Sequence, residues 1–531
     1  MEDSSGKAGC VAVIEDLDTA ELRAHGLERG PDDLIRWRRD SPDHPRNWSS
    51  RRKGFDTTVI IFFRVFRHCS QHNRSKLRRI PSYRQRPVTD NIFVKAAVAD
   101  PLRDEYSLGK RLSLVSITFM YNLGQAFGGL FIPPLSEIGG RRLPYLISCA
   151  LFSLSCVVVA AIPHQSAIWI GRFIGGFASA VPAVVTAGSV EDLFNTRTRI
   201  WIVVLWNGGS TAGLCFGPVY AAYINAAHGW KWVYYSSAIV TAVTFLCLLG
   251  VQESRPSKIL KAKIAKLRGC SKIHNLDWHN PDESPNMASL VNLVLIRPVH
   301  LLCTEPLVMM VTAISAISWG IIYFFTESLT KAYTSMGFSN TEASLPFLAM
   351  ASGVLLTSLP RLWDMRVAKR RQAQHKPVQP EDKIVGFAFA APALAVGLAW
   401  YAWTVPPAAP AGLPWIVPTL ALAPVGFAVN EMAYTLSGYL ADAYLLYAAS
   451  AFCGLAFVRA LVSGLMPLAA LALHDALGAN LAGTVVAGLA LVFCGAPWVF
   501  FRYSRTLRQR SPFARFSLQS HLRTQIDRDN I

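Results

Sequence analysis

Eleven apolar runs of about 20 residues recur along this chain, and each is long enough to cross a lipid bilayer as a helix. Inside a bilayer no water pairs with the backbone, so a spanning segment must satisfy its hydrogen bonds internally. Only 16% of the 531 residues are charged, whereas soluble proteins average about 25%. The sequence therefore predicts an all-α membrane protein. The predicted spans are residues 112–132, 143–162, 166–187, 200–224, 232–251, 303–326, 342–360, 384–403, 413–437, 448–472 and 478–501.

The positive charge is concentrated in the connections on one side of these spans. The formal net charge is +18, and residues 253–300 hold eight Lys/Arg, residues 361–383 seven, and the tail from Arg502 seven. The alternate connections hold none: residues 163–165, 405–413 and 474–480. Because Lys and Arg are retained on the cytoplasmic side, we expect both termini to be cytoplasmic. Termini on the same side require an even number of spans, which favours twelve.

Charge and cysteine placement argue against several other classes of protein. Membrane orientation explains the basic surplus, so we expect no nucleic-acid partner. Seven of the ten cysteines lie inside apolar runs and no CxxC pair occurs, so we predict neither a disulfide framework nor a metal site. No phosphate-binding glycine-rich loop and no nucleophile–base set is present. We therefore expect no cofactor and no enzymatic activity.

Residues 133–142, Pro-Pro-Leu-Ser-Glu-Ile-Gly-Gly-Arg-Arg, join the first two of the eleven runs. Gly140 allows a tight turn between two helices. Arg141 and Arg142 keep the turn on the cytoplasmic side. We expect Glu137 to pair with a nearby cation or helix N-terminus as helices slide. The stretch is thus predicted to be a short loop that works during a conformational change.

This loop resembles the one between the second and third spans of the major facilitator superfamily, which reads Gly-x-Leu-x-Asp-Arg-x-Gly-Arg-Arg. Glu137 stands at the Asp position, Pro133 replaces the first Gly, and four residues match: Leu135, Gly140, Arg141 and Arg142. The variant resembles the fungal twelve-span drug:proton antiporter and polyamine-transporter-like branch. Residues 40–49 and 439–451 resemble other signatures of that branch.

The resemblance implies the major facilitator fold, with two six-helix bundles. The expected organisation is a cytoplasmic N-terminal tail (1–54), an N-terminal bundle (55–251), a cytoplasmic linker (252–300), a C-terminal bundle (301–503) and a cytoplasmic C-terminal tail (504–531). Residues 1–52 are polar, and we expect them to be mobile.

The first span is disrupted in this sequence. Residues 55–66 are apolar but too few, and they include Arg64. Residues 67–95 form an anomalous polar insertion that contains several Lys and Arg residues. Each arginine at the centre of a span costs about 2.5–3.5 kcal/mol on insertion scales, so these residues cannot complete the span. We interpret the insertion as a retained intron or gene-model error; the alternative is a genuine insertion, with the span rebuilt from residues 92–99 or absent.

Several residues resemble motifs that move during transport. Arg172, inside a span, resembles the arginine of proton-coupled members that tunes a proton site or pairs with substrate; the alternative is a structural ion pair. Gly213, Gly217 and Pro218 resemble the antiporter motif, since glycines four apart allow close helix contact and proline gives a bend. The other expected conformational residues are cytoplasmic: a gate pair of Asp192 and Arg199, Glu253 paired with loop cations, and Asp442 at a hinge.

Glu431 is the carboxylate of greatest interest because it lies within a predicted span. A buried carboxyl group can exchange protons near neutral pH, as proton coupling requires. The alternative is a structural Glu431 bonded to neighbouring helices, with Arg459 of the next span as a partner. The remaining pathway candidates are polar or aromatic residues at membrane depth: Tyr121, Gln125, Trp206, Asn207 and Tyr323.

The expected function is secondary active transport by alternating access, in the form of proton-coupled export of a small organic compound such as a drug, toxin, polyamine or secondary metabolite. The expected partners are a small-molecule substrate, protons and the lipid bilayer, and we expect a monomer. Two alternatives stay open: a proton-independent facilitator or importer of the same fold, and a non-transporting product of the broken first span. We expect a multi-pass protein of the plasma membrane, with the vacuolar membrane as the alternative.

Overall fold

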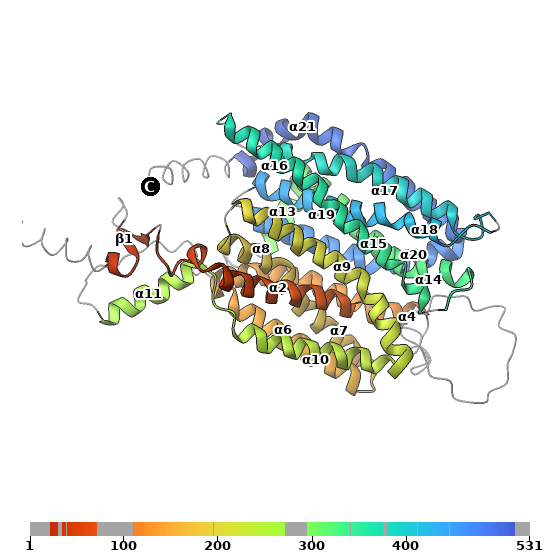
Figure 1. Ribbon diagram of the computed structural model, residues 1–531, viewed down its shortest axis with the longest axis horizontal. Helices are drawn as coiled ribbons and strands as arrows, with labels where there is room; N and C mark the ends of the chain where they lie inside the picture. Colours follow the sequence, from red (N-terminus) through yellow and green to blue (C-terminus); the bar gives the residue numbers. More distant parts are fainter. Residues whose placement is uncertain are drawn as a thin grey trace, which may run out of the picture.

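A computed structural model describes residues 22–29, 34–38, 40–71, 110–194, 196–270, 295–339, 341–374, 380–410, 412–444 and 447–515, and the account below concerns these residues. Most of them are helical (Figure 1). Two short strands, β1 (Leu27–Arg29) and β2 (Ile35–Trp37), pair antiparallel with Glu28 opposite Arg36.

Helices of the N-terminal half occupy one side of the molecule and those of the C-terminal half the other (Figure 1). The N-terminal half comprises η1 (Pro45–Asn47), α2 (Ser50–Gln71), α4 (Lys110–Leu114), η2 (Val115–Phe119), α5 (Met120–Gly139), α6 (Arg142–Ala161), α7 (Gln165–Ser179), α8 (Val181–Leu193), α9 (Thr196–His228) and α10 (Trp230–Leu249). Helix α11 (Pro256–Cys270) follows. The C-terminal half comprises α13 (Arg297–Thr304), α14 (Pro306–Ser335), η4 (Glu342–Ser344), α15 (Phe347–Gly353), η5 (Val354–Thr357), α16 (Ser358–Ala373), η6 (Pro380–Lys383), α17 (Val385–Thr404), α18 (Ile416–Leu420), α19 (Leu422–Tyr444), α20 (Ala448–Phe493) and α21 (Ala496–Arg510).

Ten helical segments in the described ranges are long and apolar enough to cross a membrane, and the eleven predicted runs all overlap them. Two runs, 448–472 and 478–501, fall in one segment, Ser450–Arg510. Gly478 divides that segment, since its φ of 76° and ψ of 174° are not helical. Some predicted ends differ from the structure: the run predicted to end at residue 360 continues to Arg371, and the run predicted to end at residue 326 continues to Ser335.

Helix α2 contains the start of the disrupted first span, and it packs against α8, α9 and α10. Helix α2 continues past Arg64 to Gln71. The side chain of Arg64 is buried, and it donates to the carbonyl oxygens of Pro182 and Ala183, each at 2.8 Å, and to Ser210 Oγ. These acceptors replace water, so the arginine is accommodated at depth. Of the predicted insertion, residues 67–71 belong to α2 and residues 72–95 lie outside the described ranges.

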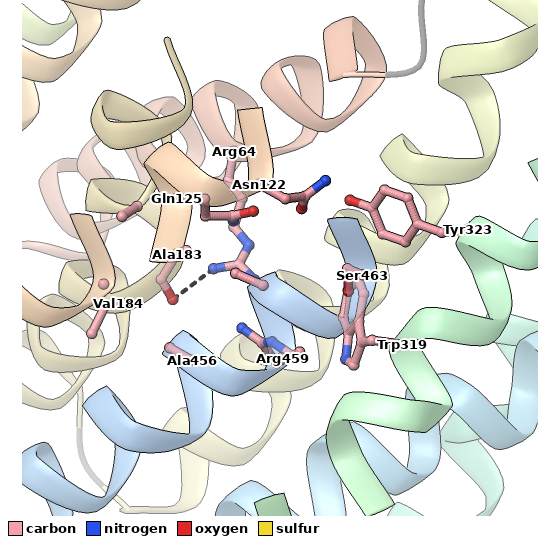
Figure 2. A pocket seen from close by; sticks show the side chains of 13 residues that line it. Arg64, Asn122, Gln125, Ala183, Val184, Trp319, Tyr323, Ala456, Arg459 and Ser463 are labelled. Carbon is pink, nitrogen blue, oxygen red and sulfur yellow. Dashed lines mark hydrogen bonds between the residues drawn. The ribbon is translucent and has the colours of Figure 1, made fainter. Parts of the chain in front are cut away.

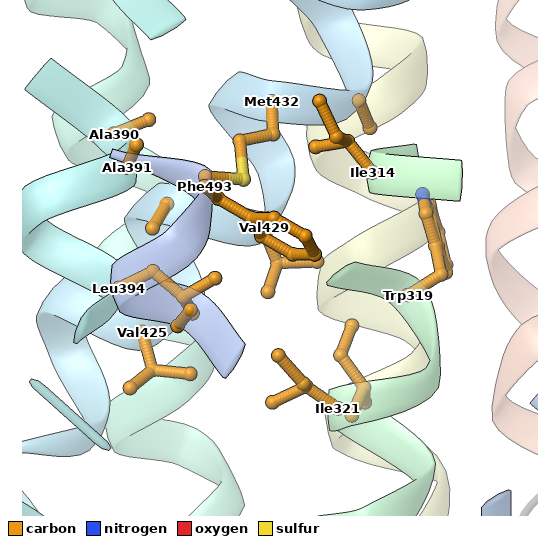
Figure 3. Packing of buried hydrophobic residues seen from close by; sticks show 14 of the residues in the cluster. Ile314, Trp319, Ile321, Ala390, Ala391, Leu394, Val425, Val429, Met432 and Phe493 are labelled. Carbon is orange, nitrogen blue, oxygen red and sulfur yellow. The ribbon is translucent and has the colours of Figure 1, made fainter. Parts of the chain in front are cut away.

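The two halves are joined along two pairs of helices. Helix α5 packs against α20, and α9 packs against α15. The large apolar cluster of the C-terminal half, part of which is drawn in Figure 3, also includes Leu214 and Cys215 of α9. Small residues permit this approach, because a Cβ on Gly208 would lie 2.9 Å from Val354 and one on Gly464 would lie 2.9 Å from Asn122. The halves are therefore in close contact at the level of these residues.

The segment before α2 is folded where it is described, which corrects the expectation of mobility for that part. Its apolar residues pack on one face of α11, forming a cluster of Leu22, Leu27, Ile35, Leu260, Ile264 and Leu267. Trp37 Nε1 donates to the carbonyl of Pro256 at 3.2 Å, and Lys263 forms an ion pair with Asp43. We call this end of the molecule, where α11 lies, the linker end (Figure 1).

Candidate functional site

A cavity lies between the two halves, lined by side chains from both (Figure 2). It is lined by Arg64, Asn122, Gln125, Gly129, Ala180, Ala183, Val184, Trp319, Tyr323, Ala456, Arg459, Ala460 and Ser463. The cavity has a volume of about 30 Å³, which is room for one or two water molecules. In this conformation the halves therefore nearly close the central space.

The N-terminal half contributes a cation and two amides to the cavity. Arg64 is fixed by its three acceptors, and its guanidinium carbon lies 4.3 Å from the ring centroid of Trp206. Asn122 and Gln125 come from α5, three residues apart, and therefore lie on one helix face. This wall is polar but well anchored.

The C-terminal half contributes two aromatic rings and a second cation. Trp319 and Tyr323 lie four residues apart on α14 and share one face. Arg459 of α20 is half-buried, and its guanidinium carbon lies 5.2 Å from the ring centroid of Trp319. Asn122 and Tyr323 point toward one another across the space (Figure 2). The cavity thus joins aromatic surface to positive charge.

Three of the predicted pathway residues line this cavity: Gln125, Tyr323 and Arg459. Five do not: Tyr121, Arg172, Trp206, Asn207 and Glu431. Sequence reasoning missed Arg64 as a lining residue because it interpreted that charge as a defect of the first span. A signal was present, since an arginine inside a span that is otherwise apolar is functional by default.

Arg172 is held inside the N-terminal half. Its Nε donates to the carbonyl of Ile117 at 2.8 Å, and its guanidinium carbon lies 4.6 Å from the ring centroid of Tyr121 and 5.9 Å from that of Tyr234. These contacts tie α7 to η2, α5 and α10. They form a structural anchor and leave Arg172 away from the cavity lining.

Glu431 lies in a second buried site, inside the C-terminal half. It forms an ion pair with Arg361 of α16, and both side chains are fully buried. Arg361 also pairs with Asp364 at 2.6 Å. Its guanidinium carbon lies 3.9 Å from the ring centroid of Tyr434, and Thr435 Oγ1 donates to Glu431 Oε1 at 3.0 Å. The partner of Glu431 is therefore Arg361, and the alternative pairing with Arg459 was wrong.

The two carboxylate oxygens of Glu431 differ in their hydrogen bonds. Glu431 Oε1 accepts from Arg361 and Thr435, whereas Oε2 is buried and has no hydrogen-bond partner among the described residues. A buried carboxylate oxygen without a donor is costly unless it carries a proton or is only transiently in this state. The carboxyl group therefore has a position at which a proton can be held.

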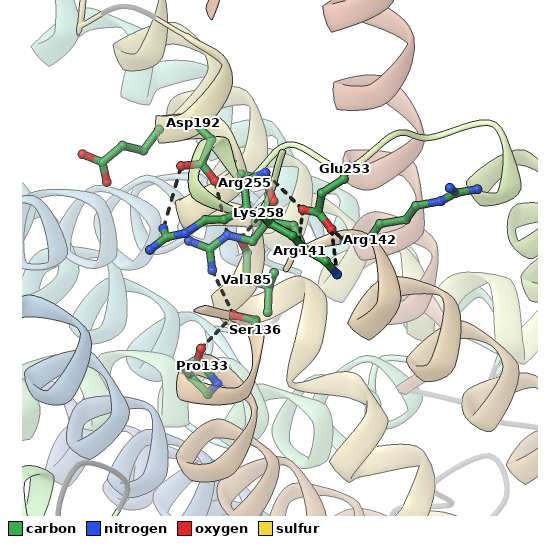
Figure 4. Close-up of polar contacts among 12 residues, drawn as sticks. Pro133, Ser136, Arg141, Arg142, Val185, Asp192, Glu253, Arg255 and Lys258 are labelled. Atoms are coloured by element: carbon green, nitrogen blue, oxygen red, sulfur yellow. Dashed lines mark hydrogen bonds and ion pairs between the residues drawn. The ribbon is translucent and has the colours of Figure 1, made fainter. Parts of the chain in front are cut away.

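The loop at residues 133–142 and the end of α8 meet at the linker end (Figure 4). Arg141 Nε donates to Asp192 at 3.3 Å, and Arg141 Nη1 donates to Ser136 Oγ at 2.9 Å. Arg255 lies 4.0 Å from the other oxygen of Asp192. Asp192 thus contacts two arginines; the expected pairing with Arg199 stays a prediction, because the side chains of Arg199 and Glu137 lie outside the description.

Glu253 caps the N-terminus of α6. Its carboxylate accepts from the backbone N–H of Arg141 at 2.7 Å and of Arg142 at 3.3 Å, and Lys258 lies 3.7 Å away. An acid that caps a helix N-terminus is stabilised by the free N–H groups there. Gly140 has a φ of 86°, and a Cβ there would lie 2.8 Å from the carboxyl carbon of Glu253. Glycine is thus required for this contact.

The remaining motif residues occupy separate places. Gly213 and Gly217 are buried on α9 next to the contact with the C-terminal half, and Pro218 lies inside the same helix. Asp442, near the end of α19, forms an ion pair with Lys383. The pair of Asp442 and Lys383 links the end of one helix to the loop before another, as Asp192 and Arg141 do in the first half.

The fold and the cavity between its halves define a multi-pass membrane transporter. The Major Facilitator Superfamily model matches residues 96–467, and the chain belongs to that family. It is 27% identical to the multidrug transporter TPO1_2 of Candida glabrata, over 90% of this chain and 78% of that protein. It is 29% identical to the multidrug transporter FLU1 of Candida albicans, over 75% of this chain and 66% of that protein.

Solved structures show the same fold at low sequence identity. The proton:xylose symporter XylE, bound to 6-bromo-6-deoxy-D-glucose, is 13% identical with a TM-score of 0.57, covering 86% of this chain and 96% of its own. The human organic anion transporter MFSD10 is 15% identical with a TM-score of 0.53, covering 84% and 99%. The predicted major facilitator fold is therefore confirmed, and the protein is a transporter and not an enzyme.

Proposed function

We propose that this protein exports a small organic compound in exchange for protons, by alternating access of the cavity to the two sides of the membrane. In this proposal each half is one moving body, residues 55–251 and 301–503. Residues 252–300 are a cytoplasmic linker, and the two tails are cytoplasmic. The protein acts as a monomer in the plasma membrane. The names of the multidrug relatives support export of an organic compound.

The observation that carries the proton coupling is the position of Glu431 beside an inter-half contact. Its neighbour Asn430 accepts a hydrogen bond from Thr211 of the N-terminal half at 2.8 Å. Asn430 also donates to Thr357 at 3.3 Å, four residues before Arg361. One short region of α19 therefore carries both the buried carboxyl group and a contact that must break when the halves separate.

This geometry supports a simple coupling mechanism. Without a proton, Glu431 is a carboxylate that attracts Arg361 and fixes α19 against α16. A proton on Oε2 removes that charge and weakens the attraction, which frees α19 to move. The contact of Asn430 with Thr211 then opens or closes with the same motion. Protonation thereby biases an equilibrium between two arrangements of the halves.

The cluster at the linker end supports the alternating part of the proposal. Asp192 and Glu253 join the loop after α5, the end of α8 and the segment after α10. These contacts lie outside the cavity, and every group belongs to the N-terminal half or to the start of the linker. The cluster is thus suited to keep the linker end of that half together as one moving body.

The test is proton movement in proteoliposomes that hold the purified full chain and a trapped pH-sensitive dye. A panel of anionic, neutral and cationic organic probes is added outside, with and without a pH gradient. We expect gradient-dependent probe transport, accompanied by proton movement, in the wild type. We expect Glu431→Gln to remove the dependence on the gradient, because the amide cannot exchange a proton.

The control is Glu342→Gln, which removes an exposed carboxylate from the same half and is expected to behave as the wild type. Transport by the wild type that ignores the gradient would identify a facilitator and contradict proton coupling. Gradient dependence that persists in Glu431→Gln would remove Glu431 from the mechanism. Failure of every probe to move would favour a non-transporting product.

A further inference from the structure

We propose that the central cavity binds an organic anion that carries an aromatic ring, with the acidic group held by Arg459 and the ring placed on Trp319. This inference names the substrate class of the transporter and rests on the proposed function. The cavity is lined by two arginines and no carboxylate. Its charge is therefore positive, and the ligand that completes it is negative.

Arg459 is the cation available to a ligand. Among the described residues it forms no hydrogen bond and no ion pair, and it lies against the ring of Trp319. It is half-buried, so part of the guanidinium faces the space between the halves (Figure 2). A cation held away from bulk water without a counter-charge is costly. A carboxylate or sulfonate that accepts two parallel N–H bonds from it would offset this cost.

Arg64 adds a fixed charge opposite Arg459. Its hydrogen bonds to Pro182, Ala183 and Ser210 hold it against α8 and α9, and it faces the same cavity from the N-terminal half (Figure 2). Because one cation comes from each half, an anion between them attracts both. Binding an anion therefore favours approach of the halves, whereas a cation would be repelled by both sides.

The aromatic part of the ligand is indicated by the shape of the C-terminal wall. Trp319 and Tyr323 share a face of α14 and provide a flat apolar surface beside Arg459. Offset stacking of a ring on Trp319 adds stabilisation beyond burial. Asn122, Gln125 and Ser463 offer further hydrogen bonds along the edge. The space of about 30 Å³ is too small for such a molecule, so it enters when α5 and α20 separate.

The first test compares two probes of similar shape and opposite fixed charge with the purified wild-type chain in detergent. The probes are 1-naphthalenesulfonate and (1-naphthylmethyl)trimethylammonium, and binding is measured by calorimetry at one pH without a gradient. We expect the sulfonate to bind at least about tenfold more tightly, in line with charge-assisted hydrogen bonds. Equal or tighter binding of the cation would overturn the proposal.

The second test uses substitutions of Arg459. We expect Arg459→Gln to weaken sulfonate binding by about tenfold or more and Arg459→Lys to weaken it less, because lysine keeps the charge and loses the planar fork. Arg505→Gln, on the exposed part of α21, is the matched control and is expected to bind as the wild type does. Unchanged sulfonate affinity in Arg459→Gln would overturn the assignment. If that variant does not fold, the lysine variant and the two probes on the wild type decide.

Binding at equilibrium separates this inference from the proposed function. The measurement needs no proton gradient and no net transport, so a facilitator with an anion site would still bind the sulfonate. Conversely, a proton-coupled exporter of cations would show gradient-dependent transport and prefer the ammonium probe.

Discussion

Arg361 and Arg459 both lie inside the C-terminal half, but their surroundings are opposite. Arg361 is fully buried between Asp364 and Glu431, so its charge is compensated by groups of the same half. Arg459 faces the cavity beside Trp319, and no lining residue is acidic. The difference is consistent with the two roles proposed above. In these proposals the compensated Arg361 holds helices in place until Glu431 takes up a proton, and the uncompensated Arg459 binds the ligand.

The largest expected effect is the loss of stability when Arg361, the arginine paired with two carboxylates, is replaced. Arg361→Leu leaves two buried carboxyl groups without their counter-charge, and removing one partner of a buried pair costs about 3–5 kcal/mol. Arg459→Leu removes a cation that no acid balances, so we expect a loss below about 1 kcal/mol. Thermal unfolding of both purified variants in detergent measures the difference. Equal losses of stability would show that the two arginines are not distinct in the way proposed.

An intermediate loss of stability is expected at Gly386, because there is little space between it and the ion pair of Arg361 and Glu431. A Cβ at Gly386 would lie 2.9 Å from the carboxyl carbon of Glu431 and 3.0 Å from Arg361 Nη2. Gly386→Ala must therefore displace the ion pair, which we expect to cost about 1–3 kcal/mol. Gly438→Ala, on α19, meets nothing within 4 Å and is expected to be neutral or slightly stabilising. Denaturation midpoints that fall equally in both variants would argue against a rigid pair.

The smallest expected effect is a change of ligand affinity at the central cavity. Trp319→Leu removes the ring beside Arg459, and a cation–π contact contributes about 0.5–1 kcal/mol where water has access. We expect affinity for 1-naphthalenesulfonate to fall by about fivefold. Because Trp319 is 6% exposed and packs in the apolar cluster, we also expect a lower unfolding temperature. Trp498, on α21, is 63% exposed, and Trp498→Leu is the control that should leave affinity unchanged. If Trp319→Leu lowers the unfolding temperature and leaves the affinity for 1-naphthalenesulfonate unchanged, the ligand does not bind on Trp319.

The predicted spans depend on local composition, and the helices follow it closely. Each apolar run became a helix because backbone pairing within the segment is the way to cross lipid. The loop at residues 133–142 was likewise predictable, since glycine and paired arginines have strong local preferences. The ion pairs of this loop were less predictable from the sequence. Arg141 pairs with Asp192, about 50 residues further along the chain, and Asp192 also contacts Arg255, about 60 residues beyond it.

The errors share one physical origin. Arg64 was interpreted as a defect and Arg361 as the first residue of a loop, because a charge within a span is costly when considered alone. Both are buried in the structure, where carbonyl oxygens of α8 surround the first and two carboxylates surround the second. The partners come from other helices, so the local sequence gives no estimate of the compensation.

From its sequence alone, this protein was determined to be a helical membrane protein with a turn motif of the major facilitator superfamily, because hydropathy and turn chemistry are local properties. Tertiary structure alone decided which charges are paired. It placed Glu431 with Arg361 and left Arg459 beside an aromatic face, because burial and Coulomb energy depend on groups that meet only when helices pack. The arrangements on which the proposed proton site and the proposed ligand site rest therefore follow from packing, whereas the helical architecture follows from composition.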